Sequence, residues 1–383
     1  MALHYGADAV YLAGTRFGMR ASAGNFDDEQ LRAAVKLAHA KGAAVHLTCN
    51  TLPREGELKS LPAFLESVQD AGVDALIIAD LGVMELAEKY APRLSRHVST
   101  QLGVINSATA RVLHSMGADR VVLARETPMA DIYEIRANTP RTLEIEAFVH
   151  GAMCVSFSGR CLLSNYLTGR DANRGTCAQP CRWRYHLVEE KRPGEYFEIS
   201  EDKGTFIMNS RDMCMIEHIP ELISAGVSSF KIEGRMKSAY YAASMTNAYR
   251  HAIDCALSDQ PLPQIWLDEV GKVSHRPYCT GFYYGDPGQH YAEASYFSDA
   301  EVCAVVESCD EAGNAVLTQR NRFCTGDALE LLTNDAEPAA FTAGAMKNEM
   351  GEPIDATPHA MMRFEMKLPR ACEPLSIVRR IKR

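Results

Sequence analysis

Helical and strand-like segments alternate from residue 1 to residue 235 of the chain. At five places an alanine-rich helical stretch ends at a glycine, and a short apolar run follows at once. With two further runs, the predicted strands are Ala9–Leu12, Val45–Thr48, Ala75–Ala79, His97–Thr100, Arg120–Ala124, Leu143–Val149 and Ser229–Glu233. Glycine after a helix adopts the left-handed conformation that ends the helix, and strands that are apolar throughout are typical of a sheet covered on both faces. The pattern therefore predicts a parallel sheet with alternating strands and helices.

Seven such units, without the glycine-rich turn of nucleotide-binding sheets, favour a TIM-type (β/α)8-like barrel over an open sheet. A complete barrel has eight units, so the pattern is one unit short: either one strand is missing from this chain or the barrel is closed differently. A barrel that lacks one strand would expose two sheet edges. The predicted fold class is α/β, with a barrel of this type followed by a small all-β domain.

The pattern changes after about residue 290, where short strand-like runs separated by turns replace the repeat. These runs are Val302–Val306, Ala315–Gln319, Ala328–Leu332 and Met361–Glu365. We therefore predict a barrel domain at residues 1–289, with a cysteine-rich insertion at about residues 150–215, and a β-barrel or sandwich at residues 290–383. Two strands of a hairpin and one helix are predicted as well, at Tyr185–Glu189, Tyr196–Ile199 and Tyr240–Leu257.

The composition is that of a soluble globular protein. Of 383 residues, 46% are hydrophobic and 23% are charged, and neither a long apolar run nor a basic–apolar leader occurs. We therefore expect no membrane segment and a cytoplasmic location. The net charge of −9 argues against non-specific binding of nucleic acid over the whole surface. A local basic patch is compatible with this charge, because seven Lys and Arg against three acids lie between Arg160 and Arg192.

Five of the twelve cysteines fall between Glu146 and Cys214, in a segment rich in glycine and arginine. They are Cys154, Cys161, Cys177, Cys181 and Cys214. Glycines let a backbone bend around a metal cluster, and N–H groups and cations offset the negative charge of thiolates. The segment therefore predicts a four-cysteine iron–sulfur site with a substrate pocket beside it.

Zinc and unligated thiols are the alternatives. Zinc sites usually show two close Cys or His pairs, whereas the spacing here is C-x6-C, C-x3-C and then the distant Cys214. Cysteine also serves as a small apolar filler, which suits the scattered cysteines better than the clustered ones. A disulfide framework is not expected in a chain of this length without a secretory leader.

Polar side chains lie at or just after the ends of the predicted strands, where a TIM-type barrel carries its chemistry. They are Asn50, Asp80, Gln101, Arg125, Glu126, His150, Lys231, Glu233 and Arg235. The predicted catalytic residues are His150, Lys231, Glu233 and Arg235, and the predicted substrate-binding residues are Asn50, Gln101, Arg125, Arg160 and Arg174. Arginine matches the geometry of a carboxylate, and histidine shuttles protons near neutral pH. The alternative is that some of these residues form salt bridges at the barrel mouth.

Several motifs resemble those of the collagenase-like peptidase family, number thirty-two among peptidases of unassigned mechanism. They are E-A-F-V-H-G-A-M-C, G-R-C-L-L-S, N-R-G-T-C-A-Q-P-C-R-W, N-S-R-D-M-C, F-K-I-E-G-R-M-K-S and S-H-R-P-Y-C-T-G-F-Y-Y-G. They occur in the order of the family and over almost the whole chain. The resemblance implies the small all-β domain, and an additional first strand ahead of Met1.

The activity that this resemblance implies is not proteolysis, although the family is named for peptidases. The nearest subgroup implies oxygen-independent hydroxylation of a tRNA wobble uridine to 5-hydroxyuridine, with a 4Fe–4S cluster and with prephenate, a dicarboxylate, as co-substrate. Carried over residue by residue, the cluster ligands fall on Cys154, Cys161, Cys177 and Cys214, and Cys181 is left over. The expected partners are tRNA, the small dicarboxylate and a paralogous protein.

Two other functions remain open, a peptidase and a non-catalytic, cluster-bearing partner of a hydroxylase. The sequence contains neither a G-x-S-x-G elbow nor an H-E-x-x-H pair. A peptidase would therefore need an activated nucleophile such as Cys154 beside His150. That use of Cys154 would divert an expected cluster ligand.

Overall fold

The chain forms two compact units, and neither unit is continuous in sequence. A computed structural model describes residues 1–19, 24–154, 161–172, 175–183, 186–187, 197–198, 210–288 and 298–382. The barrel unit comprises Asp8–Met236 and Arg276–Ser295, and the C-terminal unit comprises Met1–Ala7, Lys237–His275 and Tyr296–Arg383. The first seven residues and the segment that follows residue 236 thus belong with the C-terminal unit.

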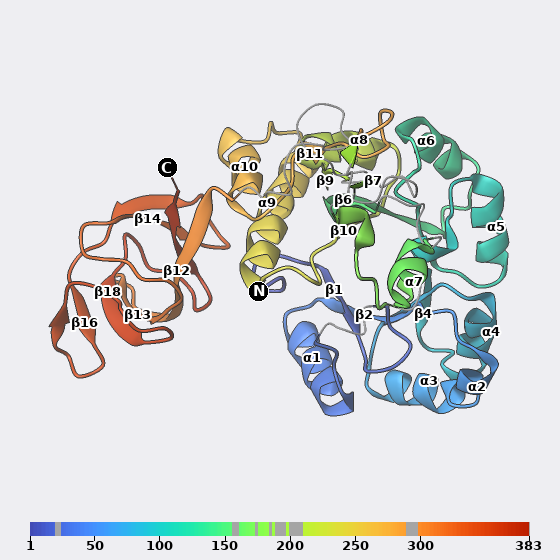
Figure 1. Cartoon of the computed structure of the whole chain (residues 1–383), viewed down its shortest axis with the longest axis horizontal. Coiled ribbons are helices and arrows are strands. Elements are labelled where there is room, and N and C mark those ends of the chain that lie inside the picture. Colours follow the sequence, from blue (N-terminus) through green and yellow to red (C-terminus); the bar gives the residue numbers. More distant parts are fainter. Residues whose placement is uncertain are drawn as a thin grey trace. The chain divides into compact units, whose positions relative to one another are not determined.

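Parallel strands form most of the sheet of the barrel unit (Figure 1). They are β1 (Ala9–Ala13), β2 (Ala44–Cys49), β3 (Ala75–Ile78), β4 (Ser95–Val98), β5 (Arg120–Val122), β6 (Glu144–Ala152) and β10 (Ser229–Ile232). From β1 to β6, neighbours in the chain are neighbours in the sheet, and β10 pairs with β6. All the strands predicted from the glycine–apolar repeat are present, so the parallel sheet is confirmed.

Short strands extend this sheet beyond the predicted pattern. β9 (Asp212–Cys214) runs antiparallel to β6, and β11 (Tyr278–Cys279) runs parallel to β9. β9 lies in the N-S-R-D-M-C motif and β11 in S-H-R-P-Y-C, so the sheet brings two distant motifs together. The two predicted strands of the hairpin pair where they are described, because β7 (His186–Leu187) runs antiparallel to β8 (Phe197–Glu198). The predicted turn between them lies outside the described residues.

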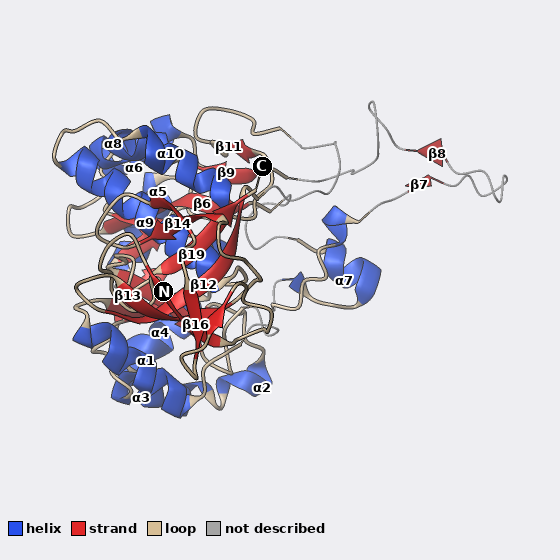
Figure 2. Cartoon of the chain, turned by 90° about the vertical axis from the view of Figure 1, so that its left-hand side faces the viewer, coloured by secondary structure: helices blue, strands red, loops and turns tan. Residues whose placement is uncertain are grey.

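Helices cover the outside of the barrel sheet (Figures 1 and 2). They are α1 (Asp28–Ala40), α2 (Glu55–Leu58), α3 (Leu61–Asp70), α4 (Leu81–Tyr90), α5 (Ser107–Ser115), α6 (Met129–Ala137) and α8 (Ile219–Ser224), with the 3-10 turns η1 (Thr100–Leu102) and η4 (Ile216–His218). Side-chain caps begin three of them, because Asp27, Asp80 and Asn106 accept hydrogen bonds from backbone N–H groups of the first turn. Asp80, a polar residue at a predicted strand end, thus has a structural partner.

One helix does not belong to this outer layer. α7 (Leu163–Thr168) and the 3-10 turn η3 (Pro180–Arg182) lie within the cysteine-rich insertion. The views in Figures 1 and 2 together place α7 beyond one end of the sheet rather than in the ring of helices around it. The insertion therefore adds a structure of its own to the barrel unit.

The C-terminal unit combines helices with an antiparallel sheet. Its elements are α9 (Ala239–Leu257), α10 (Gln264–Glu269), η5 (Val270–Lys272), β12 (Ala300–Cys309), β13 (Asn314–Gln319), β14 (Ala328–Leu332), β15 (Ala339–Thr342), β16 (Met346–Asn348), β17 (Pro353–Ile354), β18 (Arg363–Lys367) and β19 (Ile377–Ile381). The order of the strands is β15-β14-β19-β12-β13-β18-β16-β17, and all pairs are antiparallel. The predicted helix at Tyr240–Leu257 and the all-β character of the C-terminal domain are confirmed.

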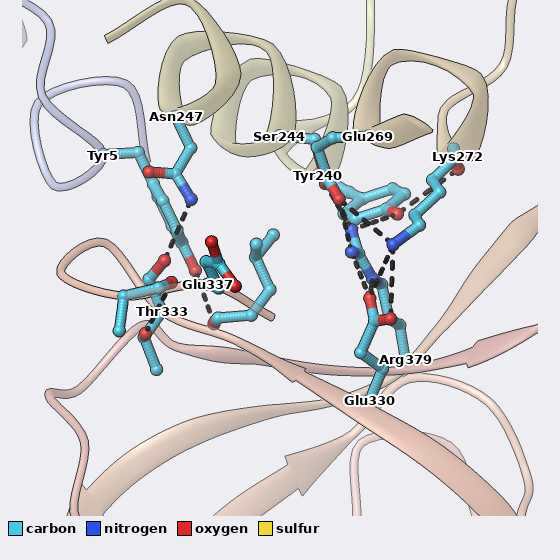
Figure 3. Close-up of polar contacts among 12 residues, drawn as sticks. Tyr5, Tyr240, Ser244, Asn247, Glu269, Lys272, Glu330, Thr333, Glu337 and Arg379 are labelled. Carbon is cyan, nitrogen blue, oxygen red and sulfur yellow. Dashed lines mark hydrogen bonds and ion pairs between the residues drawn. The ribbon is translucent and has the colours of Figure 1, made fainter. Parts of the chain in front are cut away.

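A buried ion-pair cluster joins the helices of this unit to its sheet (Figure 3). Arg379 of β19 is 0% exposed and donates to Glu269 Oε2 at 2.6 Å and to Glu330 Oε1 at 2.8 Å. Lys272 Nζ lies 3.0 Å from Glu330 Oε1, so two cations face two carboxylates. A short distance away, Tyr5 donates to the carbonyl of Leu332. Since buried charges are stable only when paired, this cluster fixes α10 and η5 on the strands.

None of the helices in the described ranges combines the length and the apolar composition that are needed to cross a bilayer.

Candidate functional site

A buried carboxylate lies inside the barrel unit, on a strand whose other buried residues are mostly apolar. Glu146 of β6 is 4% exposed and accepts hydrogen bonds from Lys231 Nζ at 2.8 Å, Arg120 at 2.9 Å and Ser229 at 2.9 Å. Burial alone would raise the pKa of the Glu146 carboxyl, but Lys231 and Arg120 outweigh burial and hold its pKa well below the usual range. Glu146 is therefore a fixed negative charge that orients Lys231.

Two histidines, His46 of β2 and His97 of β4, lie in the same interior. The rings of His46 and His97 meet edge to face, with centroids 4.6 Å apart. Burial, and next the charge of Arg120, lower the pKa of His46 to about 4 and the pKa of His97 to about 3. Both imidazoles are therefore neutral at pH 7, and Lys231 and Arg120 carry the positive charge of this region.

Aromatic rings surround the Lys231 ammonium. Its Nζ lies 4.8 Å from the ring centroid of Tyr11 and 5.7 Å from that of Phe148, distances at which a cation is attracted to an aromatic face. The Tyr11 hydroxyl donates to Glu233 Oε2 at 3.0 Å. Tyr11 thus connects β1 to the residue that follows β10, and it brings two predicted catalytic residues, Lys231 and Glu233, to one place.

The backbone at Gly151 fixes how β10 approaches β6. Gly151 has a φ of +120°, and a Cβ on it would lie 2.5 Å from the carbonyl oxygen of Glu233. The Glu233 N–H donates to the carbonyl of His150 at 2.9 Å. Only glycine combines this φ with so close an approach, so Gly151 sets the distance between Glu233 and His150.

His150 is buried at the carboxyl end of β6. Its Nε2 lies 3.4 Å from the hydroxyl of Tyr278 in β11, and Cys214 of β9 is its partner across the ladder. His150 therefore lies between the barrel sheet and the two added strands. A histidine beside the Tyr278 phenol and paired across the ladder with Cys214 is suited to hold or move a proton at this end of the sheet.

A buried ion pair holds the two added strands together. Arg276 donates through its Nε and its NH2 to Asp212 Oδ1, at 3.0 and 2.7 Å, and its backbone N–H donates to Asp212 Oδ2 at 3.1 Å. Arg211 donates to the carbonyl of Tyr278 at 2.7 Å. Next to these contacts is a cavity of about 250 Å³ lined by Arg211, Tyr278, Cys279, Thr280, Tyr284 and Asp286.

Arg125 lies at the carboxyl end of β5 and is half-buried. Its guanidinium carbon is 4.0 Å from the ring centroid of Phe148, so Phe148 has contacts with two cations, Arg125 and Lys231. Within the described ranges, Arg125 has no carboxylate partner. A guanidinium that is partly withdrawn from water without an anion is suited to bind one from a ligand.

The other predicted site residues at strand ends have different hydrogen-bond partners. Asn50 accepts a hydrogen bond from the Met19 N–H at 3.0 Å, and Arg235 donates to the Met19 carbonyl at 2.7 Å and to Asn25. Both residues thus hold the connection between β1 and α1. Gln101 lies in η1, where its N–H donates to Ser99. The predicted roles of these three residues in catalysis or substrate binding stay predictions, as does that of Glu126.

The predicted cluster ligands come from four different places in the barrel unit. Cys154 follows β6 and is exposed, Cys161 precedes α7, Cys177 precedes η3, and Cys214 ends β9. Within the described ranges, no three His, Cys, Asp or Glu side chains are placed to share one metal ion. Arg160 and Arg174, which were predicted to bind substrate, lie outside the described residues.

The chemistry of the four thiols fits an iron–sulfur cluster. The Gln179 N–H lies 3.3 Å from the sulfur of Cys177, and such donors stabilise thiolates and tune clusters. In a 4Fe–4S cluster the four cysteines bind different irons, whereas a zinc site gathers its donors on one ion. The support for a cluster is therefore the presence of four thiols with an N–H donor beside one of them, and not a close approach of the four sulfurs to one another.

Glu146, Tyr11, Phe148 and Tyr278 are site residues that were not predicted from the sequence. A signal existed for Glu146, because a carboxylate inside an apolar strand must be paired. Tyr11 and Phe148 resemble ordinary core residues, and Tyr278 belongs to a strand of two residues.

Two sequence profiles match the chain. The profile of "Peptidase family U32" matches residues 1–293, and that of "Peptidase family U32 C-terminal domain" matches residues 298–379. The chain is 36% identical over 387 residues to tRNA hydroxylation protein P1 of Bacillus subtilis (strain 168), covering 99% of this chain and 91% of that protein.

Two proteins of Escherichia coli (strain K12) are similar as well. The chain is 36% identical over 401 residues to tRNA hydroxylation protein P, covering 93% of this chain and 88% of that protein. It is 38% identical over 259 residues to the 23S rRNA 5-hydroxycytidine C2501 synthase, covering 68% of this chain and 38% of that protein. The names of these relatives thus refer to hydroxylation of two kinds of RNA.

Proposed function

The chain belongs to peptidase family U32, and from that premise we propose that it is an RNA-modifying enzyme that hydroxylates a tRNA. More closely, the substrate is a wobble uridine, the product is 5-hydroxyuridine, and the reaction uses prephenate and no oxygen. The names of the relatives support hydroxylation of RNA in general. The finer assignment rests on the sequence motifs and on the site described above.

The contact of Phe148 with two cations is the observation that carries this proposal. Arg125 and Lys231 both approach its ring, and Arg125 has no carboxylate partner within the described ranges. Prephenate offers two carboxylates, one attached to its ring and one on a side chain. A guanidinium binds one carboxylate through a forked contact, and the aromatic face of Phe148 accommodates the ring.

The remaining residues of the group bind, orient and hold protons. Glu146 binds the Lys231 ammonium and holds it beside Tyr11 and Phe148. Glu233 and Tyr11 share a hydrogen bond, and His150 faces Tyr278. In the proposed site, His150 and Glu233 would hold or move a proton, because both lie at the carboxyl end of the barrel strands.

Cys154, Cys161, Cys177 and Cys214 would hold the 4Fe–4S cluster. When bound, the cluster supplies redox or substrate-activating chemistry at the carboxyl end of the barrel. A paralogous protein is the proposed partner. We place the enzyme in the cytoplasm, where a reducing environment preserves thiols.

The test combines a cofactor assay with an RNA assay. Protein purified without oxygen is assayed for iron, sulfide and visible absorption, and tRNA nucleosides of a strain without the gene are analysed by mass spectrometry. We expect iron and sulfide in the protein, and loss of 5-hydroxyuridine that the wild-type gene restores and Arg125→Ala does not. An unchanged amount of 5-hydroxyuridine in the tRNA of the deletion strain would contradict the proposal.

A further inference from the structure

Two large aromatic side chains are exposed on the insertion that carries α7 and η3. Tyr166 of α7 is 86% exposed, and Trp183, which follows η3, is 43% exposed. The second tryptophan of the chain, Trp266, is 2% exposed and stacks on His251. Exposed apolar groups often mark a binding surface, and Leu162, the residue before α7, is exposed as well.

Hydrogen bonds hold the aromatic residues on a built structure. The Ser164 hydroxyl of α7 accepts a hydrogen bond from the Ala178 N–H at 2.9 Å. Arg170 Nε donates to the carbonyl of Thr176 at 2.8 Å, and the backbone then turns at Pro180 to end η3 at Trp183. Tyr166 and Trp183 therefore belong to one small module, which we call the α7–η3 module (residues 161–172 and 175–183).

The charge of this part of the chain is opposite to that of the whole protein. Seven Lys and Arg against three acids lie between Arg160 and Arg192, in a chain of net charge −9. Arg170, which is exposed, is one of them. Exposed aromatic rings next to cations are the combination with which proteins bind single-stranded nucleic acid, because the rings stack on bases and the cations face phosphates.

We infer that the α7–η3 module is a stacking platform for unpaired bases of RNA, with Tyr166 and Trp183 as the stacking residues and Arg170 as a phosphate contact. This inference rests on the proposed function, since it takes the RNA substrate from there. The module also carries Cys161 and Cys177. A base stacked on this platform is thus held on the same segment as two of the predicted cluster ligands.

Trp183 itself provides the measurement. Stacking of a base on an exposed indole quenches its fluorescence, whereas the buried Trp266 contributes a constant background. An RNA stem-loop of the anticodon-arm type is titrated into the full-length protein, with tryptophan emission and RNA anisotropy recorded together. We expect quenching by the stem-loop and none by a fully paired duplex of equal length.

Variants separate stacking from a general loss of structure. Tyr166→Ala is expected to weaken binding of the stem-loop about tenfold, as removal of one stacked ring does. Trp183→Phe is expected to bind normally by anisotropy without the quenching signal. Tyr133→Ala removes an exposed tyrosine of α6 and is the matched control that leaves binding unchanged.

The outcomes distinguish the two proposals. If wild-type protein binds the stem-loop while Tyr166→Ala and Trp183→Ala bind it equally well, the platform is wrong and the proposed function stands. If the wild-type protein binds no tRNA and no stem-loop, both fail. Emission of Trp183 that responds to a paralogous protein and to no RNA would identify the module as a protein-docking surface and overturn the inference.

Discussion

Lys231 and Glu146 form an ion pair of 2.8 Å inside the barrel unit, between strands that are 85 residues apart in sequence. Arg120 approaches the other oxygen of the same carboxylate. One negative charge therefore faces two positive ones, and it sets where the Lys231 ammonium lies. Both the stability of the barrel unit and the position of Lys231, a predicted catalytic residue, therefore depend on Glu146.

Glu146→Gln should destabilise the barrel unit strongly. Removing the charge leaves Lys231 and Arg120 without their buried partner, which costs about 3–5 kcal/mol in comparable cases. Glu144→Gln is the matched control, because Glu144 binds the same Arg120 but is about half exposed, and exposed pairs contribute about 0–1 kcal/mol. Urea unfolding at pH 7 measures both variants. Equal losses of stability would contradict the role assigned to Glu146.

The barrel unit should lose stability when the pH falls below about 6.5. An unfolded chain protonates His46 and His97 near that pH, whereas burial lowers their pKa in the folded protein to about 4 and about 3. The stability contributed by the neutral rings is therefore complete above pH 6.5 and is lost toward the folded pKa, by about 2 kcal/mol per histidine at pH 5.

Unfolding of His97→Gln at pH 7 and pH 5 tests this dependence. We expect a smaller difference between the two pH values than in the wild-type protein. His359→Gln changes an exposed histidine and should leave the difference as it is. A wild-type protein equally stable at both pH values would show that these rings are not buried as neutral groups.

Gly151→Ala should displace Glu233 from His150. A Cβ would lie 2.5 Å from a backbone oxygen, at a φ of +120°, and we expect a loss of about 2–4 kcal/mol together with reduced activity. Gly56→Ala is the control, because a Cβ there meets nothing within 4 Å and Gly56 lies within helix α2. That control should be neutral or slightly stabilising.

Arg125→Ala should weaken binding of the dicarboxylate about tenfold or more, since a charged hydrogen bond contributes about 1.5–3 kcal/mol. Calorimetric titration with prephenate measures this change directly. Arg93→Ala, which removes an exposed arginine, should bind prephenate as the wild-type protein does. Equal affinities of both variants for prephenate would show that Arg125 does not bind the dicarboxylate, although it contacts Phe148.

Arg379→Ala should unfold the C-terminal unit at a lower denaturant concentration. The substitution leaves Glu269 buried opposite Lys272 alone, and loss of one partner of a buried pair costs about 3–5 kcal/mol. Arg363→Ala breaks the exposed pair with Glu307 in the same sheet and should cost less than about 1 kcal/mol. Near-UV circular dichroism during unfolding measures the loss of aromatic packing, to which Tyr240 contributes, since its hydroxyl accepts a hydrogen bond from Arg379.

Much of the fold could be predicted because the glycine–apolar repeat is local. The turn at Gly42, for instance, ends α1 and starts β2 within a few residues. β9 and β11 could not be predicted, because they span three and two residues and contain charged and polar side chains. Their pairing depends on Asp212 and Arg276, which are distant in sequence and carry no pattern that links them.

The candidate site was predictable in part for the same reason. His150, Lys231 and Glu233 lie at or near the carboxyl ends of β6 and β10, so their proximity was expected from the fold, and the structure brings them together. Arg235 and Asn50 also follow strand ends, but both contact the loop at Met19. A position at a strand end thus predicts that a residue lies at the mouth of the barrel, whereas the contacts it makes there depend on the loops.

The chain passes between its two units at residues 7/8, 236/237, 275/276 and 295/296. A single proteolytic cut therefore cannot release either unit as one continuous peptide. Recombination near residue 296 during evolution would transfer β12–β19 without α10 and η5. Glu269 and Lys272 would then be separated from the Arg379 with which they evolved. Exchange of the C-terminal strands between members of the family should thus succeed only when the helices that precede them are inherited together.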